Sequence, residues 1–238
     1  MSYYGYSKQP TVAEKKEKAR KSLQKLKKKN PDVEPVVIEG TKLAKSWWGK
    51  SWNENLESYA DYENRITRGK SYVRNNAVLD LKISKGIIEA KVQGSRAKPY
   101  DVEIQIEPLS SEKWEQVTEL CNHRIDSLEQ LIEGKFPKEL EVLFTDRKYG
   151  MFPSPEEIYF DCSCPDWASM CKHVAATLYG IGARLDINPM LFFELRDLDG
   201  QKLIRKSMDQ KLESMMKNAG KKSKREIPDK DISDIFGL

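Results

Sequence analysis

The most informative stretch of this chain is Cys162-Ser163-Cys164-Pro165-Asp166-Trp167-Ala168-Ser169-Met170-Cys171-Lys172-His173. It contains three of the four cysteines and one of the two histidines of the 238-residue chain. Two thiols one residue apart, a spacer, and a Cys-x-His pair supply three sulfurs and one imidazole, which complete the ligand set of a closed tetrahedral zinc site. Sulfur ligands favour Zn²⁺ over Mg²⁺ or Ca²⁺. We therefore predict that Cys162, Cys164, Cys171 and His173 bind one structural zinc ion, the alternative being a redox pair or a group of buried cysteines.

The flanking residues predict how the four ligands converge. Ile158-Tyr159-Phe160 is typical of a short β-strand, and Pro165-Asp166 is a turn signal. From about Cys171 the pattern becomes helical. The apolar face of this helix is formed by Val174, Leu178, Ile181 and Leu185. A strand, a turn and a helix would then hold the metal between them.

The ligand spacing resembles the SWIM zinc finger, with Cys164-Pro165-Asp166 after the second ligand and Cys171-Lys172-His173-Val174-Ala175-Ala176 opening the helix. This module occurs with bacterial Swi/Snf-type helicase-like ATPases and in eukaryotic recombination and ubiquitin-ligase proteins. Over residues 1–200 the chain is similar to bacterial stand-alone SWIM proteins, in Met1–Tyr6, Pro35–Gly40, Trp47–Trp52, Arg68–Arg74 and Val92–Arg96. The resemblance implies a module that binds DNA or proteins and has a Swi/Snf-type DNA-dependent ATPase as its partner.

Composition limits the class of protein. Charged residues make up 33% of the chain, and no apolar run is long enough to cross a membrane. The first eight residues lack the apolar segment of a secretion signal. Thiolates kept for a metal suit a reducing compartment. We expect a soluble protein of the cytoplasm, or of the nucleoid within it, with no membrane partner and no small-molecule substrate.

Positive charge is concentrated at the start of the chain. Residues 1–30 hold ten Lys or Arg against Glu14 and Glu17, an excess of eight positive charges. Because the whole chain has a net charge of +4, the residues after 30 have a net charge of −4. Thr11 and Glu14 form a capping-box pattern that opens a helix, and Asn30-Pro31 should end it. Such a helix can lie along a nucleic-acid backbone, where affinity falls with salt. The alternative is a solvated, lysine-rich helix docked by its apolar stripe.

The next segment combines tryptophans with basic residues. The spacing of Trp47, Trp48 and Trp52 predicts an amphipathic helix from Thr41 to about Tyr59. We expect these tryptophans to form core rather than a base-stacking platform. Gly69-Lys70-Ser71 matches the end of a phosphate-binding loop, but the glycine required five positions earlier is Asn64, so a nucleotide-binding loop is excluded.

Residues 77–106 predict a three-stranded antiparallel unit, with strands at 77–83, 87–92 and 100–106. Within 41–100 there are twelve basic and six acidic residues, which makes this region a second candidate for nucleic-acid contact. An ordinary solvated sheet rim is the alternative. The candidate contacts in this region are Arg65, Arg68, Lys70, Arg74, Arg96 and Lys98. A further candidate is Lys172, which lies between two metal ligands.

Beyond the sheet an acidic helical stripe runs from Trp114 to Ile132, with Cys121 as a small buried residue rather than a fifth ligand. Helices are also expected at 190–196 and 202–217, and the apolar residues of 227–238 suggest a docking peptide or a segment packed on the body.

The sequence predicts an α+β protein in which an antiparallel β unit has flanking helices and zinc pins the strand-turn-helix finger. The expected division is a basic arm at 1–30, an α+β body at 31–150, the finger at 151–186, helices at 187–217 and a tail at 218–238. Four strong ligands leave no site for a catalytic water, so we expect no enzyme activity. The predicted function is nucleic-acid binding, with DNA the expected ligand, or an adaptor role. A pure protein-interaction scaffold is the alternative.

Overall fold

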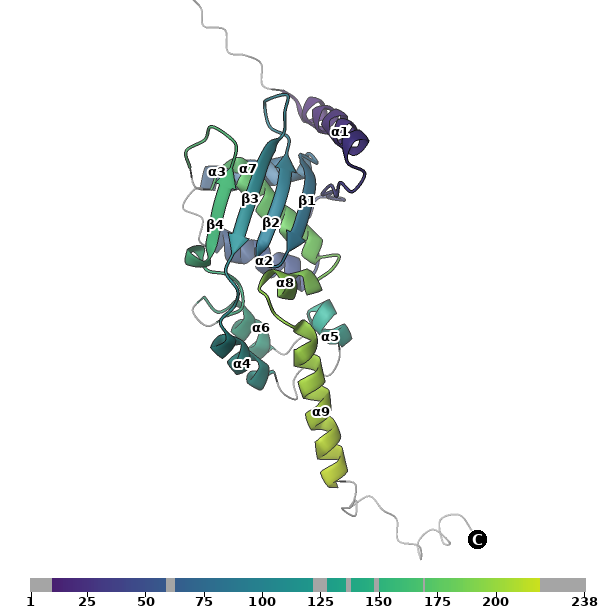
Figure 1. Ribbon diagram of the computed structural model, residues 1–238, viewed down its shortest axis with the longest axis vertical. Coiled ribbons are helices and arrows are strands. Elements are labelled where there is room, and N and C mark those ends of the chain that lie inside the picture. The colour runs from purple at the N-terminus through teal and green to yellow at the C-terminus, as the bar shows by residue number, and fades with distance from the viewer. Residues whose placement is uncertain are drawn as a thin grey trace, which may run out of the picture.

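A four-stranded antiparallel sheet of order β1-β2-β3-β4 is the centre of the fold (Figure 1). The strands are β1 (Val78–Ser84), β2 (Ile87–Val92), β3 (Tyr100–Ile106) and β4 (Ile158–Cys162). The computed structural model describes residues 10–58, 63–121, 128–135, 138–147, 150–168 and 170–218. The predicted α+β class with an antiparallel sheet and flanking helices is confirmed. The predicted strands at 87–92 and 100–106 match, and the first strand lies one residue later than predicted.

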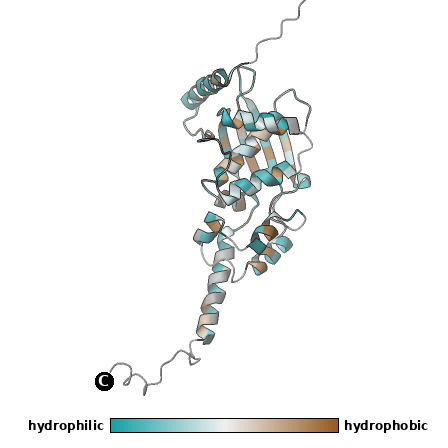
Figure 2. Ribbon diagram, turned by 180° about the vertical axis from the view of Figure 1, so that it is seen from behind, coloured by the Kyte–Doolittle hydropathy of each residue, from teal (hydrophilic) through white to brown (hydrophobic). Residues whose placement is uncertain are grey.

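The sheet has one buried and one open face. In β3, Val102 and Ile104 are buried while Asp101 and Glu103 are exposed, as the alternation of apolar and polar residues requires. The buried face packs against α7 (Lys172–Leu185), which also contacts α2 (Trp47–Ser58) and α3 (Glu63–Arg74). Figure 2 views the molecule from the opposite side to Figure 1 and shows these helices lying across this face of the sheet. The predicted finger therefore contributes its strand to the common sheet and its helix to the common core.

The remaining helices lie toward the two ends of the sheet (Figure 1). The basic helix α1 (Val12–Lys29) lies beside the β1 edge, at the end of the sheet that carries the β2–β3 loop (Figure 1). At the opposite end lie the shorter helices and the long helix α9. Their bounds are α1 Val12–Lys29, α4 Ser111–Leu120, α5 Leu128–Glu133, α6 Lys138–Thr145, the 3₁₀ turn Pro155–Glu157, α8 Met190–Leu195 and α9 Gly200–Asn218. None of the described helices is long and apolar enough to cross a membrane.

The tryptophans of α2 belong to the core, as predicted. Trp48 and Trp52 are fully buried, and their indole N–H groups donate to the carbonyls of Leu131 and Leu178 at 2.7 and 2.9 Å. The helix itself begins at Trp47 rather than at Thr41. Its start is fixed by Asp186, which follows α7 and accepts hydrogen bonds from Lys45 N, Ser46 N and Ser46 Oγ at 2.6, 2.8 and 2.6 Å.

We expect Asp186→Ala to lower the free energy of unfolding by about 1.5 kcal/mol, because removing a carboxylate cap leaves partly buried N–H groups without an acceptor. Chemical denaturation of the two proteins measures the difference. The matched control is Asp101→Ala, which removes an exposed partner of Lys91 and should cost less than about 0.5 kcal/mol. Equal losses in the two variants would show that Asp186 does not anchor α2.

One helical prediction needs correction, and one helix was not predicted. The stripe from Trp114 to Ile132 is not one helix in the described residues, because α4 ends at Leu120 with Cys121 as its C-cap and α5 begins at Leu128. Cys121 is buried, as predicted. The helix α3 was not predicted at all, although it carries Arg65, Arg68, Lys70 and Arg74. The predicted docking peptide at 227–238 lies outside the described residues.

Candidate metal centre

The three elements predicted around the Cys/His cluster are present and bring its ligands together. Cys162 is the last residue of β4, held in register opposite Val102. Ser163 bonds to Asp101 through both its backbone N–H and its hydroxyl, which aligns the chain after Cys162 with β3. Cys171 is the N-cap residue of α7 and His173 lies in the first helical turn.

The ligand atoms form a compact group. The three sulfurs and a ring nitrogen of His173 all lie within 4.8 Å of one another. Nδ1 of His173 is 3.9 Å from the Cys162 sulfur and 3.8 Å from the Cys171 sulfur. Zinc bonds of about 2.3 Å to sulfur and 2.0 Å to nitrogen place tetrahedral S and N ligands about 3.5 Å apart. The two His173–Cys pairs therefore need to close by only a few tenths of an ångström, and the most widely separated ligand atoms by about 1 Å. Cys162, Cys164, Cys171 and His173 can therefore hold one metal ion.

The electrostatics of the cluster also suit a cation. Cys162 lowers the pKa of Cys171 to about 3 through a side-chain hydrogen bond, and His173 and the backbone N–H groups that open α7 add to this shift. The Cys171 thiolate in turn raises the pKa of Cys162, and burial raises that of Cys164. Three sulfurs so close together cannot all be ionised without a shared positive charge, which a divalent metal supplies.

The imidazole of His173 is fixed by packing. Tyr100 lies against it at a centroid distance of 4.4 Å, and Tyr72 meets it edge-on at 5.4 Å. Gly94 packs against both rings, since an added Cβ would lie 2.9 Å from His173 Nε2 and 2.4 Å from the Tyr100 ring. The buried Nε2 has no hydrogen-bond partner among the described residues. The ring is thus presented to the sulfurs through Nδ1.

The loop between the second and third cysteines is tied to α3. Arg65 forms a salt bridge of 3.1 Å with Asp166, and both side chains are mostly buried. The next residue, Trp167, is 88% exposed. A solvated tryptophan beside a metal centre is typical of a contact surface. Trp167 is not among the residues predicted from sequence, where its only signal is a tryptophan in a turn outside any apolar periodicity.

The seven candidate nucleic-acid contacts are distributed over different surroundings. Arg65 is engaged by Asp166, and Lys70 is paired with Glu57 at 2.8 Å and lies over the Tyr179 ring. Arg96 lies over the Tyr100 ring. Arg74 and Lys98 are exposed. Arg68 and Lys172 line one groove beside the cluster, together with Lys15 and Lys18 of α1.

Comparison with known proteins gives one informative similarity. The chain is 33% identical over 163 residues to the uncharacterized protein Rv2102 of Mycobacterium tuberculosis. The similarity covers 68% of this chain and 58% of the relative, so the chain spans less than two thirds of that protein's length. No family model matches the chain. No solved structure matches it either.

Proposed function

We propose that this chain is a non-catalytic zinc-binding module that binds nucleic acid. The observation that carries the proposal is the position of the Cys₃His cluster, which shares one end of the sheet with the basic side chains of α1, Arg68 and Lys172. Phosphate groups are the partners expected for such a concentration of cations.

The cluster supports zinc in particular. Three thiolates and an imidazole are soft ligands that suit zinc, and four protein ligands leave no position for a water that could act in catalysis. Since Cys171 and His173 open the helix that lies against the sheet, metal binding stabilises the core as well as the loop between the ligands. The metal's role in this proposal is structural.

The resemblance to the SWIM zinc finger extends the proposal. It supports an adaptor role beside a Swi/Snf-type DNA-dependent ATPase, in the cytoplasm or the nucleoid. The division into an arm at 1–30, a body at 31–150, a finger at 151–186, helices at 187–217 and a tail at 218–238 stays a prediction. Of the candidate contacts, Arg68 and Lys172 are the ones that the proposal uses first.

A specific observation favours a second candidate, the protein-interaction scaffold. A cavity of about 420 Å³ lies between the segment 35–45 and the end of α7. The apolar side chains of Val37 and Ile187, which line it, are 58% and 79% exposed. Exposed apolar residues around a concave surface are typical of protein contact sites.

Salt-dependent binding separates the two candidates. The zinc-loaded chain should bind labelled single-stranded or duplex nucleic acid in fluorescence anisotropy, with affinity falling steeply as salt rises, because each neutralised phosphate releases counterions. The control is the same chain after zinc removal by a chelator, which should bind more weakly. A zinc-loaded chain that binds neither DNA nor RNA at low salt would contradict the proposal and favour the scaffold.

A further inference from the structure

A groove of about 670 Å³ lies beside the metal centre. One wall is α1, the opposite wall is α3, and the floor includes Gly94, which also packs against His173. Lys172, between two metal ligands, lines the same groove. The metal centre, the basic helix and the β2–β3 loop therefore share one concave surface.

The charge of this groove is positive. Lys15, Lys18, Arg68 and Lys172 line it, against the single carboxylate of Glu14. Glu14 is already occupied by the capping box, where Oε2 accepts hydrogen bonds from Thr11 N and Thr11 Oγ1 at 2.7 and 3.0 Å. Within the part of the chain that the structure describes, none of the four cations has a carboxylate within 4.0 Å. An anionic ligand would therefore meet cations that are not already neutralised.

The polar groups of the groove suit a phosphate-bearing chain rather than a bare anion. Ser71 and the half-buried Tyr72 of α3 line it beside Arg68, and so does the buried Asn75, which directly follows α3. Hydroxyl and amide groups beside cations bind sugar and phosphate oxygens, and a tyrosine ring offers a surface for a base or ribose. This combination of a charged track and an aromatic ring is typical of single-strand binding.

The size of the groove favours a single strand over a duplex. Cavities of about 300–1,000 Å³ enclose ligands of drug size, which is comparable to one or two nucleotides. A duplex is a stiff rod with its bases stacked inside, so it cannot place nucleotides in such a space without unpairing. A single strand bends freely and exposes both phosphates and bases.

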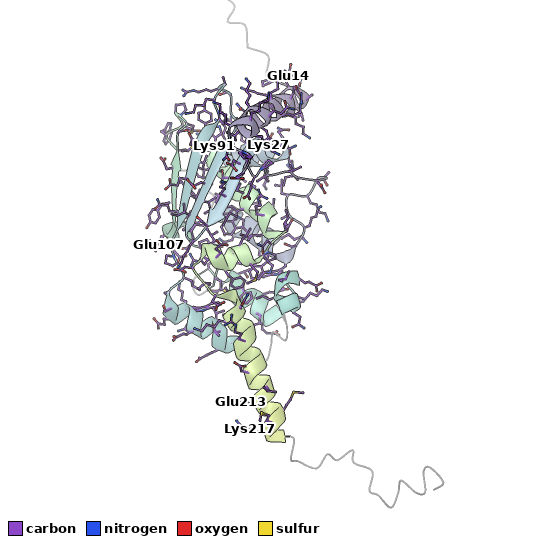
Figure 3. The ribbon with its side chains drawn as sticks, turned by 45° about the vertical axis from the view of Figure 1, so that its right-hand side comes forward. Glu14, Lys27, Lys91, Glu107, Glu213 and Lys217 are labelled. Atoms are coloured by element: carbon purple, nitrogen blue, oxygen red, sulfur yellow. The ribbon has the colours of Figure 1, made fainter. Side chains whose placement is uncertain are left out.

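The helix α1 is held to the body by few contacts. Ala19 is its only buried residue among those described, and Lys18 Nζ donates to Ser95 O at 2.6 Å across the end of the groove. Its first turns line the groove, whereas Lys27, near its end, is not among the lining residues. Figure 3 labels Glu14 and Lys27 at opposite ends of α1, about 20 Å apart along the helix axis for thirteen residues. The two ends therefore provide matched test and control positions on one helix.

We propose that the groove between α1 and α3 binds a single-stranded segment of nucleic acid, with phosphates contacting Lys15, Lys18, Arg68 and Lys172 and with Tyr72 against a base or sugar. This proposal rests on the proposed function and assigns to it a site and a strand preference. Duplex regions would bind only through surface phosphate contacts. A single-stranded end or loop would be the preferred ligand.

The test compares two triple variants of the full, zinc-loaded chain. Lys15→Ala, Lys18→Ala and Arg68→Ala remove three cations of the groove while leaving Lys172 beside its metal ligands unchanged. On a single-stranded oligonucleotide they should flatten the plot of log affinity against log salt by about 2, because each phosphate contact on a single strand contributes about 0.7. The control variant carries Lys27→Ala, Lys28→Ala and Arg205→Ala. It removes the same amount of charge outside the groove, so its plot of log affinity against log salt should keep most of the slope of the unmodified chain.

Zinc content and melting temperature are measured on both variants. If the groove variant melts early, the double variant Lys15→Ala, Arg68→Ala takes its place, because it keeps the Lys18 contact to Ser95. A hairpin duplex without free ends should bind more weakly than the single strand. Inorganic phosphate and a nucleoside monophosphate, added as competitors, should displace the strand only at far higher concentrations than unlabelled strand.

Each contrary outcome has a distinct meaning. If the unmodified chain binds no nucleic acid, the proposed function fails and the groove assignment fails with it. If the unmodified chain binds but the groove and control variants behave alike, the groove assignment alone is wrong. Duplex binding as tight as single-strand binding overturns the strand preference. If free phosphate or the monophosphate displaces the strand at the same concentrations as unlabelled strand does, the groove is a site for a small anion instead.

Discussion

The Cys171→Ser variant should purify with less than about half an equivalent of zinc, whereas the unchanged chain should hold about one, because a structural Cys₃His site needs all four ligands. Cys171 is almost fully buried, and its sulfur faces both Cys162 and His173. Serine replaces the thiolate by a hydroxyl that stays protonated at neutral pH and binds zinc weakly. Elemental analysis of protein prepared without chelators measures the metal directly.

The same substitution should lower stability well beyond the loop. Structural zinc in small fingers contributes roughly 10–16 kcal/mol of apparent binding free energy at neutral pH. Here Cys171 caps α7, whose residues Val174, Leu178 and Ile181 are buried in the core. Losing the metal removes the link between β4 and the start of this central helix, so denaturation should begin at a clearly lower temperature.

A matched control is available within the chain. Cys121 is also a buried cysteine, but it is the C-cap residue of α4 and lies outside the cluster. Cys121→Ser should therefore keep about one equivalent of zinc, because Cys121 is not one of the four ligands. The metal assignment is wrong if the unchanged chain itself holds less than about half an equivalent, or if the two variants lose zinc equally.

The cluster was predictable from sequence because its information is local. Four ligands within twelve positions leave few ways to fold that do not bring them together. The strands 87–92 and 100–106 were also predicted at their observed bounds, since alternating apolar residues specify which face is buried. The capping box of Thr11 and Glu14 and the end of α1 at Asn30 are local signals of the same kind, and both are present.

What sequence analysis missed depends on tertiary packing. The helix α3 contains few apolar residues and a central glycine, so its pattern gave no helical stripe. The groove combines residues from α1, α3, the β2–β3 loop and α7, which are far apart in the chain. The basic residues could be counted from sequence, but only the fold separates Arg68, which lines the groove, from Arg65 and Lys70, which pair with Asp166 and Glu57.

Gly69 begins the segment Gly69-Lys70-Ser71, whose sequence excludes a phosphate-binding loop, and the structure gives this glycine a packing role. It lies in α3 where this helix meets α7. A Cβ added there would be 2.6 Å from the Cβ of Ala175 and 3.0 Å from its carbonyl carbon. These neighbours are a short side chain and backbone, so they cannot turn aside as the end of a long side chain can.

Gly69→Val should lower the free energy of unfolding by about 3 kcal/mol, because overpacking at a rigid contact costs about 1–3 kcal/mol or more and outweighs the small gain in helix propensity over glycine. Denaturant titration measures the loss. Ser71→Val, two residues further along α3 at an exposed position, controls for the effect of valine in this helix.

A second substitution tests the cause of the loss. If the close approach to Ala175 is responsible, Gly69→Ala with Ala175→Gly should recover part of the stability that Gly69→Ala alone loses, because the double variant removes one of the two clashing Cβ atoms. The backbone contact at 3.0 Å would remain, so recovery should be incomplete. Additive effects of the two substitutions would show that the helices do not need glycine to approach.

The close contact also lies near the metal ligands, because Ala175 is two residues after His173 on α7. A forced separation of α3 and α7 should therefore also reduce the zinc content of Gly69→Val. An unchanged zinc content would limit the damage to the contact between the two helices.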